Sequence, residues 1–138
     1  MDLMRNYMPH NIALIGCGAI AQSFYLPALA NRRREFDRIW VVDPIDKARQ
    51  VACSIVEGEQ SATLADIEVD LQFVIVASPN MHHFSAACAA LSRNAHVLIE
   101  KPFVIWPDEG RELIKLAKAH HRLITVNQLR RLFPPTIE

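Results

Sequence analysis

Short runs of apolar residues recur along the chain, separated by longer stretches in which apolar residues fall at helical spacing. The runs are continuously apolar instead of alternating, and β-branched residues dominate them, as in strands that helices cover on both faces. They predict strands over residues 12–15, 39–42, 73–77, 97–99 and 123–126. The intervening stretches predict helices over residues 20–33, 46–55, 81–93 and 108–121. This alternation of strand and helix is typical of a parallel sheet.

A weaker unit lies between the second helix and the third long strand. Residues 60–62 predict a short strand, and Thr63 is placed to cap a short helix over residues 64–67. Right-handed crossovers then give a doubly wound α/β fold with three layers, helix, sheet and helix, and strand order 3-2-1-4-5-6. The 138 residues suit one domain, so we expect residues 1–10 to be an N-terminal tail and residues 11–138 the folded domain.

Composition and charge exclude several classes of function. Fifteen Lys and Arg balance fifteen Asp and Glu, which argues against a nucleic-acid-binding or membrane-surface protein. No apolar run approaches the roughly 20 residues that cross a bilayer, and residues 1–10 lack the apolar core of a secretory signal. Three scattered cysteines and the adjacent His120 and His121 predict neither a disulfide framework nor a metal site. We expect a cytoplasmic protein.

The turn after the first strand carries a glycine pattern. Residues 16–21 read Gly-Cys-Gly-Ala-Ile-Ala, the form G-x-G-x-x-A, directly after a strand and before a helix. In a dinucleotide-binding turn, Gly16 would allow the tight turn, Gly18 would let the backbone approach a pyrophosphate, and Ala21 would allow close packing. The helix start at Ala19 and Ile20 would supply amide donors to the phosphates. The alternative is a glycine turn that serves packing alone.

An S-adenosylmethionine-dependent methyltransferase is a competing interpretation of this turn. Its first motif normally carries an acidic residue two positions before the first glycine, where this chain has Leu14. It also carries a third glycine, where this chain has Ile20. Both departures favour the dinucleotide.

Asp43 ends the second strand, 22 positions beyond Ala21. This spacing is near that of the acidic residue that accepts hydrogen bonds from the adenosine ribose. Its charge would repel the 2′-phosphate of NADP, so NAD is the expected cofactor and NADP the less expected one. Lys47 or Arg49 would soften that preference if either side chain reached back. Otherwise Asp43, before Pro44, is a turn former.

Further short motifs follow the glycine turn in order. They are Leu26-Pro27-Ala28-Leu29, Ala77-Ser78-Pro79-Asn80 with His83, Glu100-Lys101-Pro102, and Arg131 with Pro134. Together, over residues 11–135, they resemble the glucose-fructose oxidoreductase and inositol dehydrogenase family. The resemblance implies that residues 11–138 are an N-terminal NAD(P)-binding Rossmann domain.

The resemblance also implies roles for the later motifs. Ser78, Pro79 and Asn80 would line the cofactor near the nicotinamide ribose, with His83 in the same turn. Glu100 and Lys101 would lie beside the cofactor, with a cis peptide before Pro102, and Lys101 would also approach the reacting hydroxyl of the substrate. A lysine partly desolvated there can share a proton with an alkoxide, whereas the plain alternative is a solvated lysine in a turn.

Members of this family continue into a second domain, which binds substrate and often supplies an Asp and a His to catalysis. No residue here matches that Asp and His, so we expect the substrate domain to be absent and this chain alone to be inactive. Three hypotheses remain. The first is the cofactor domain of an NAD(P)-dependent dehydrogenase that transfers hydride to or from a sugar, cyclitol or related alcohol, completed by another domain or chain. The others are a standalone dinucleotide-binding module, with a partner surface around Leu129, Leu132 and Phe133, and a remnant that binds nothing.

Overall fold

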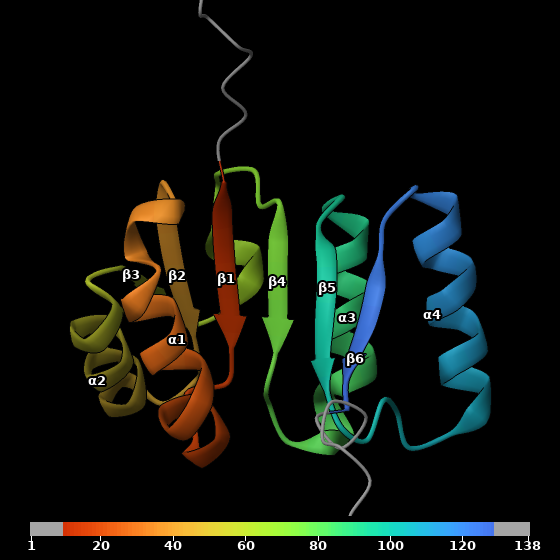
Figure 1. The fold of residues 1–138 in the computed structure, drawn as a ribbon. Helices are drawn as coiled ribbons and strands as arrows, with labels where there is room; N and C mark the ends of the chain where they lie inside the picture. Colours follow the sequence, from red (N-terminus) through yellow and green to blue (C-terminus); the bar gives the residue numbers. More distant parts are fainter. Residues whose placement is uncertain (1–9, 129–138) are drawn as a thin grey trace, which may run out of the picture.

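The computed structural model describes residues 10–128, and within them one parallel sheet runs through the molecule (Figure 1). Its strand order is β3-β2-β1-β4-β5-β6, which confirms the predicted order, including the weak third strand. The strands are β1 (Asn11–Ile15), β2 (Arg38–Val42), β3 (Glu59–Ser61), β4 (Phe73–Val76), β5 (His96–Glu100) and β6 (Ile124–Asn127). Because all neighbours pair in parallel, the carboxyl ends of the strands meet at one edge.

Helices cover both faces of the sheet, as a three-layer fold requires. They are α1 (Leu26–Asn31), α2 (Asp46–Val56), α3 (His83–Ser92) and α4 (Pro107–Ala119). One apolar cluster packs α1 and α2 against β1 and β2, and a second packs α3 and α4 against β4 and β5. Strand β1 serves both, since Ala13 belongs to one cluster and Leu14 to the other, and neither side chain is exposed. This two-sided burial explains the continuous apolar run.

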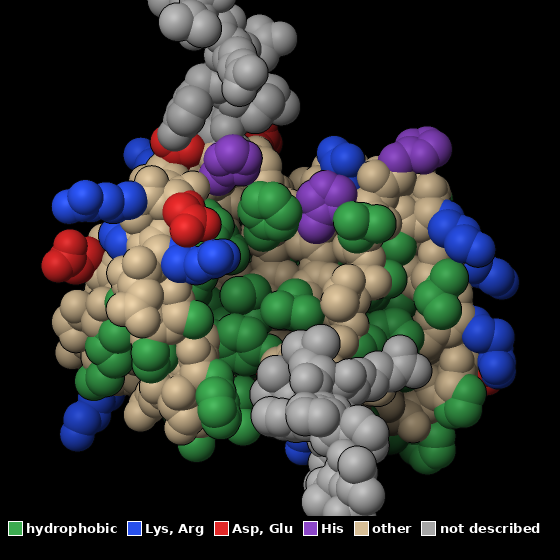
Figure 2. Space-filling model, viewed as in Figure 1, with side chains coloured by type: hydrophobic (Ala, Val, Ile, Leu, Met, Phe, Trp, Pro, Cys, Tyr) green, Lys and Arg blue, Asp and Glu red, His purple; other side chains and the backbone are tan. Residues whose placement is uncertain are grey.

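Coverage of the sheet is uneven. On the face that α1 and α2 cover, their cluster reaches as far as Ile75 of β4, and beyond it hydrophobic side chains of β4, β5 and β6 gather in a more open region (Figure 2). A hollow of about 500 Å³ on this face is lined by Phe73, Ile75, Leu98 and Leu123, among others. Phe73 is 38% exposed and Leu123 is 71% exposed. The expected cover on both faces therefore holds for the centre of the sheet and not for this part.

The first helix contains a widened turn. Residues 21–25 form a π-helical turn between an α-helical start at residue 19 and α1. The N–H of Leu26 donates to the carbonyl of Ala21, five residues back instead of four. Pro27, the next residue, has no N–H to continue the α-helical ladder, which accounts for the change of spacing. The α-helix ends at Asn31, two residues short of the predicted end at residue 33.

The segment after β3 differs from the prediction. It forms a 3₁₀ turn, Leu64–Asp66, instead of a helix over residues 64–67. Thr63 makes no capping hydrogen bond, because its hydroxyl donates to Oδ2 of Asp66 at 2.7 Å. Leu64 and Ile67 are buried and anchor the segment by packing.

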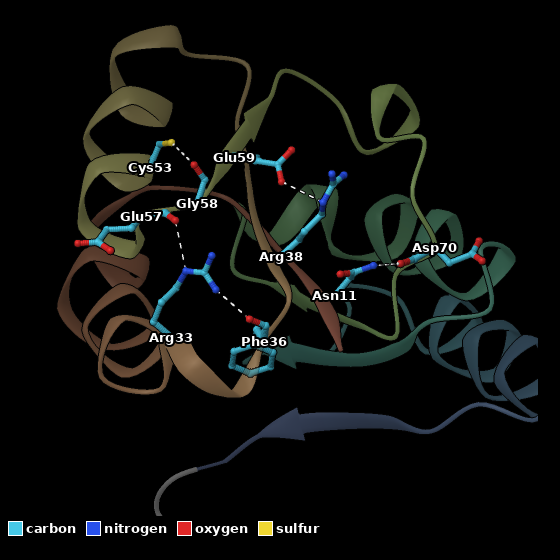
Figure 3. A network of polar contacts seen from close by, with 9 residues as sticks. All are labelled: Asn11, Arg33, Phe36, Arg38, Cys53, Glu57, Gly58, Glu59 and Asp70. Carbon is cyan, nitrogen blue, oxygen red and sulfur yellow. Dashed lines mark hydrogen bonds and ion pairs between the residues drawn. The ribbon is translucent and has the colours of Figure 1, made fainter. Parts of the chain in front are cut away.

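Polar contacts tie the connections together at the amino ends of the strands (Figure 3). The Arg33 guanidinium donates to the carbonyl of Phe36 at 2.8 Å and to that of Glu57 at 3.3 Å. Asn11, which begins β1, donates through its side chain to the carbonyl of Asp70 at 2.9 Å. In the described part of the chain, no helix is long and apolar enough to cross a membrane.

Candidate functional site

A cavity of about 540 Å³ opens at the carboxyl edge of the sheet, where β1 lies between β2 and β4. Here the strand order reverses, and the connections from β1 and β4 leave toward opposite faces, which opens a crevice in folds of this kind. The lining comes from the turns after β1, β2, β3 and β4. It includes Gly16, Asp43, Pro44, Ala62, Thr63, Ser78, Pro79 and His82. Four connections that are distant in sequence therefore meet at one site.

Gly16 holds the first turn against the turn after β4. Its φ of +94° is a conformation that side chains disfavour, and its N–H donates to the carbonyl of Val42 at 2.8 Å. A Cβ at this position would lie 2.6 Å from the carbonyl oxygen of Ala77 and 2.7 Å from the nitrogen of Ser78. Glycine is therefore required here by the packing of two backbones.

Gly18 meets a different requirement. A Cβ built on Gly18 has no neighbour within 4 Å, and Gly18, Ala19 and Ile20 are all exposed. The carbonyl of Gly18 accepts from the N–H of Gln22 at 3.0 Å, so the helix begins at this point. The first amides of a helix have no partner within it and suit an anion, and open space beside Gly18 is what a pyrophosphate needs.

Cys17, between these glycines, is fully buried. Burial, with the Asp43 charge as the second cause, raises the pKa of its thiol to about 11. The thiol therefore stays protonated near neutral pH, and the side chain fills space in the core.

The Asp43 carboxylate is fixed at the mouth of the glycine turn. Its Oδ2 accepts from the N–H of Cys17 and its Oδ1 from the N–H of Ile45, both at 2.9 Å. Each carboxylate oxygen can accept a second hydrogen bond, so the half-buried group keeps acceptor capacity for a ribose hydroxyl. Arg49 does reach back, donating to the carbonyl of Asp43 at 2.6 Å and contacting the Asp46 carboxylate at 2.8 Å. The Arg49 guanidinium is therefore already hydrogen-bonded to these two protein acceptors.

Ser78 faces the same cavity from the turn after β4. Its Oγ is buried and has no hydrogen-bond partner among the described residues. A buried hydroxyl without a partner is costly, so this atom is suited to a ligand hydroxyl. Pro79 and Asn80 follow it as exposed residues, and Asn80 does not line the cavity.

His83 lies behind this turn instead of facing the opening. Its side chain is 1% exposed, and its two ring nitrogens are within 3 Å of the carbonyl oxygens of Ser78 and Pro102. The ring is thus surrounded by protein backbone.

The Glu100 carboxylate, at the carboxyl end of β5, accepts hydrogen bonds from several neighbouring groups. Its Oε1 accepts from the Tyr25 hydroxyl at 2.5 Å and from the side-chain amide of Asn127 at 2.7 Å. Its Oε2 accepts from the backbone N–H of Lys101 at 3.1 Å. Burial first, and the hydrogen bond to Glu100 second, raise the pKa of Tyr25 above its usual value, so its hydroxyl remains a donor.

Sequence reasoning did not find Tyr25 or Asn127. Asn127 ends β6, so the rule that carboxyl ends share one edge could have placed it near the site. Tyr25 lies in the π-helical turn, and no local pattern marks it.

Lys101 is exposed and stands in the turn after β5, and it does not line the cavity. The peptide bond between Lys101 and Pro102 is cis, as the resemblance implied. The structure therefore brings Gly16, Asp43, Ser78 and Pro79 together, and places Lys101 at the end of the next strand along the same edge. Arg131, Pro134 and the apolar residues at 129, 132 and 133 lie outside the described residues. Within residues 10–128 no cluster of metal-ligating side chains occurs.

Comparison with known proteins adds relatives of the same architecture. The chain is 31% identical over 123 residues to the uncharacterized oxidoreductase YdgJ of Escherichia coli, covering 87% of this chain and 34% of that protein. It is 30% identical over 138 residues to the D-glucoside 3-dehydrogenase of Escherichia coli, covering 88% and 38%. The chain thus spans little more than a third of the length of these relatives.

A solved structure agrees with this relationship. The WlbA dehydrogenase of Chromobacterium violaceum, in complex with NADH and UDP-GlcNAcA, superposes with a TM-score of 0.79 at 25% identity, covering 89% of this chain and 36% of that one. Residues 10–128 match the family model described as the oxidoreductase family with an NAD-binding Rossmann fold. With its fold, its glycine turn and this match in agreement, the chain belongs to that family, the one that includes glucose-fructose oxidoreductase and inositol dehydrogenase, and forms its NAD-binding domain.

Proposed function

We propose that this chain is the cofactor domain of an oxidoreductase that transfers a hydride between nicotinamide and the carbinol carbon of a sugar, cyclitol or related alcohol. The observation that carries the proposal is the cavity in which Gly16, Asp43 and the unpartnered hydroxyl of Ser78 meet. Two relatives support the substrate class, since one is a D-glucoside dehydrogenase and another was crystallised with a nucleotide sugar.

Each part of the site would bind a different part of the cofactor. The backbone of Gly16, Gly18, Ala19 and Ile20 would bind the pyrophosphate, and Asp43 the adenosine ribose. The turn of Ser78, Pro79 and Asn80 would contact the nicotinamide ribose. NAD(H), when bound, supplies the hydride chemistry, whereas the protein orients it.

Lys101 is the proposed proton-transfer residue. It stands at the carboxyl end of β5, beside the strand that carries the Ser78 turn, and its backbone is held by Glu100. An ammonium group there can share a proton with the substrate hydroxyl as the carbon–hydrogen bond breaks or forms. Glu100 and His83 contact protein groups, so in this proposal they support the site from behind.

A partner-dependent module without turnover of its own is the second candidate. The apolar hollow over β4, β5 and β6 favours it, because exposed apolar surface is frequently a site of association. Turnover of an alcohol by this chain alone would exclude it. NADH binding without alcohol turnover, even after a substrate domain is added, would support it, whereas turnover after that addition would support the first candidate.

The first experiment is a calorimetric titration of the purified chain with NADH and with NADPH. We expect saturable binding that is tighter for NADH, because the Asp43 carboxylate accepts ribose hydroxyls and repels a 2′-phosphate. No binding of either by a folded chain would contradict the proposal.

Asp43→Ala should narrow the preference for NADH over NADPH to within about threefold, since it removes both the acceptor and the repulsive charge. The same titrations measure it. Asp43→Asn is the matched variant, because it keeps an acceptor for one of the amides of Cys17 and Ile45 while losing the charge. A preference unchanged in both variants would mean that Asp43 is not the ribose acceptor.

Lys101→Ala should change NADH affinity by less than about twofold relative to the wild type. It should reduce alcohol turnover about 100-fold or more in an assembly that contains a substrate domain. The side chain is exposed and outside the cavity, so the fold should not change. Lys115→Ala, on the exposed side of α4, is the control for loss of one lysine. Full turnover by the Lys101 variant would contradict the proposed role.

A further inference from the structure

The His83 side chain joins two turns that follow different strands. Its Nε2 lies 2.9 Å from the carbonyl oxygen of Ser78, in the turn after β4. Its Nδ1 lies 2.8 Å from the carbonyl oxygen of Pro102, in the turn after β5. One buried ring therefore bridges the two backbones that carry the residues proposed for the nicotinamide end of the cofactor.

In a hydrogen bond at either contact the ring nitrogen must be the donor, because a carbonyl oxygen can only accept. A neutral imidazole has one N–H and an imidazolium has two. Both contacts are hydrogen bonds only when both ring nitrogens carry protons. In the described part of the chain no carboxylate is hydrogen-bonded to the ring, so the two carbonyls are its polar partners.

Several side chains of the bridged turns are exposed, although Phe103, which follows Pro102, packs against the core. Pro79, Asn80, Lys101 and Pro102 are all exposed, so packing of these side chains does not fix the separation of the turns. Glu100 holds the N–H of Lys101 but makes no hydrogen bond to the Ser78 turn. Among the described residues, the ring of His83 is the side chain that hydrogen-bonds to both turns.

We infer that His83 is a positioning residue that acts as a double hydrogen-bond donor. It holds the Ser78 turn and the Pro102 turn at a fixed separation and so shapes the space for the nicotinamide half of the cofactor. This inference rests on the proposed function and assigns to a buried side chain the geometry of that half of the site. The adenosine half, at Asp43 and the glycine turn, has no hydrogen bond to His83.

The test compares two ligands, NADH and ADP, which shares the adenosine and the pyrophosphate and lacks both the nicotinamide and its ribose. His83→Phe keeps an aromatic ring and removes both donors. It should weaken NADH binding about tenfold and change ADP binding less than about twofold. His83→Gln retains a donating amide and should fall between the wild type and the Phe variant. Calorimetric titrations give both constants for each variant.

A matched control separates positioning from general loss of stability. Leu91→Val lies on the same helix, α3, is fully buried and belongs to the core. It should lower stability and leave the ratio of the NADH and ADP affinities unchanged. If the Phe variant does not fold, the inference is tested with the Gln variant and with nitrogen NMR of the His83 ring.

Nitrogen NMR of the histidine rings, assigned with His83→Gln, reports how many ring nitrogens are protonated at the pH of the titrations. Two N–H groups on His83 support the double donor, and a neutral ring overturns it. An unchanged ratio of NADH to ADP affinity in folded variants also overturns the inference and leaves the proposed function intact. Failure of the wild type to bind either ligand would instead overturn the proposed function.

Discussion

Gly18→Val is expected to weaken NADH binding by about 100-fold or more while the chain stays folded. Gly18 is exposed at the helix start, and a Cβ there meets no atom within 4 Å. The branched side chain would therefore not disturb the protein, but it would fill the space through which a pyrophosphate approaches the backbone. A 100-fold loss corresponds to about 2.7 kcal/mol of binding free energy, a reasonable size for excluded phosphate contacts.

Calorimetric titration measures this loss, with circular dichroism and urea unfolding as checks on the fold. The free energy of unfolding should change by less than about 1 kcal/mol, as for most surface substitutions. Gly18→Ala is the graded control, because a single methyl group blocks less of the same space. Unaltered NADH affinity in the Val variant would place the pyrophosphate elsewhere.

Gly16→Ala, unlike Gly18→Val, is expected to lower the stability of the fold. The positive φ of Gly16 costs about 1–2 kcal/mol once a side chain is present. The added Cβ would also lie 2.6 Å from the backbone oxygen of Ala77, and relieving such overlap costs about 1–3 kcal/mol more. We therefore expect a loss of about 2–5 kcal/mol in the free energy of unfolding, a large share of the stability of an ordinary domain.

Urea unfolding of Gly16→Ala beside Gly18→Ala isolates the effect, because the two variants add the same methyl group two residues apart. The first should be strongly destabilised and the second nearly neutral. Equal stability of the two would show that the turns after β1 and β4 can separate without cost, contrary to the contacts described.

The strands could be predicted because they follow from short-range patterns, and their order because right-handed crossovers restrict how such strands assemble into a doubly wound sheet. Runs such as Ile12–Ile15 lie in strands that are covered on both faces of the sheet. A continuously apolar sequence indicates such two-sided burial directly. The glycine turn was recognisable for the same reason, since the conformation of Gly16 and the open space at Gly18 are local demands on residue type.

The supports behind the site could not be predicted because they depend on contacts between distant residues. Tyr25 and Glu100 are 75 positions apart in the sequence, and Tyr25 and Asn127 are 102 apart. A motif indicates that Glu100 belongs to the site, but not that its oxygens are occupied by protein donors. Thr63 failed as a predicted cap because a nearby carboxylate, Asp66, competed for its hydroxyl.

The widened turn at residues 21–25 limits the length of the first helix. This turn already takes up one extra residue, and each further residue of a helix turns the chain by about 100°, so one insertion within it would rotate the residues on one side of it relative to the other. Tyr25 could not then meet Glu100 while Gly18 kept its place at the cavity. The segment between the glycine turn and Pro27 should therefore tolerate substitutions at exposed positions such as Gln22 and Ser23 far better than the insertion of a single residue.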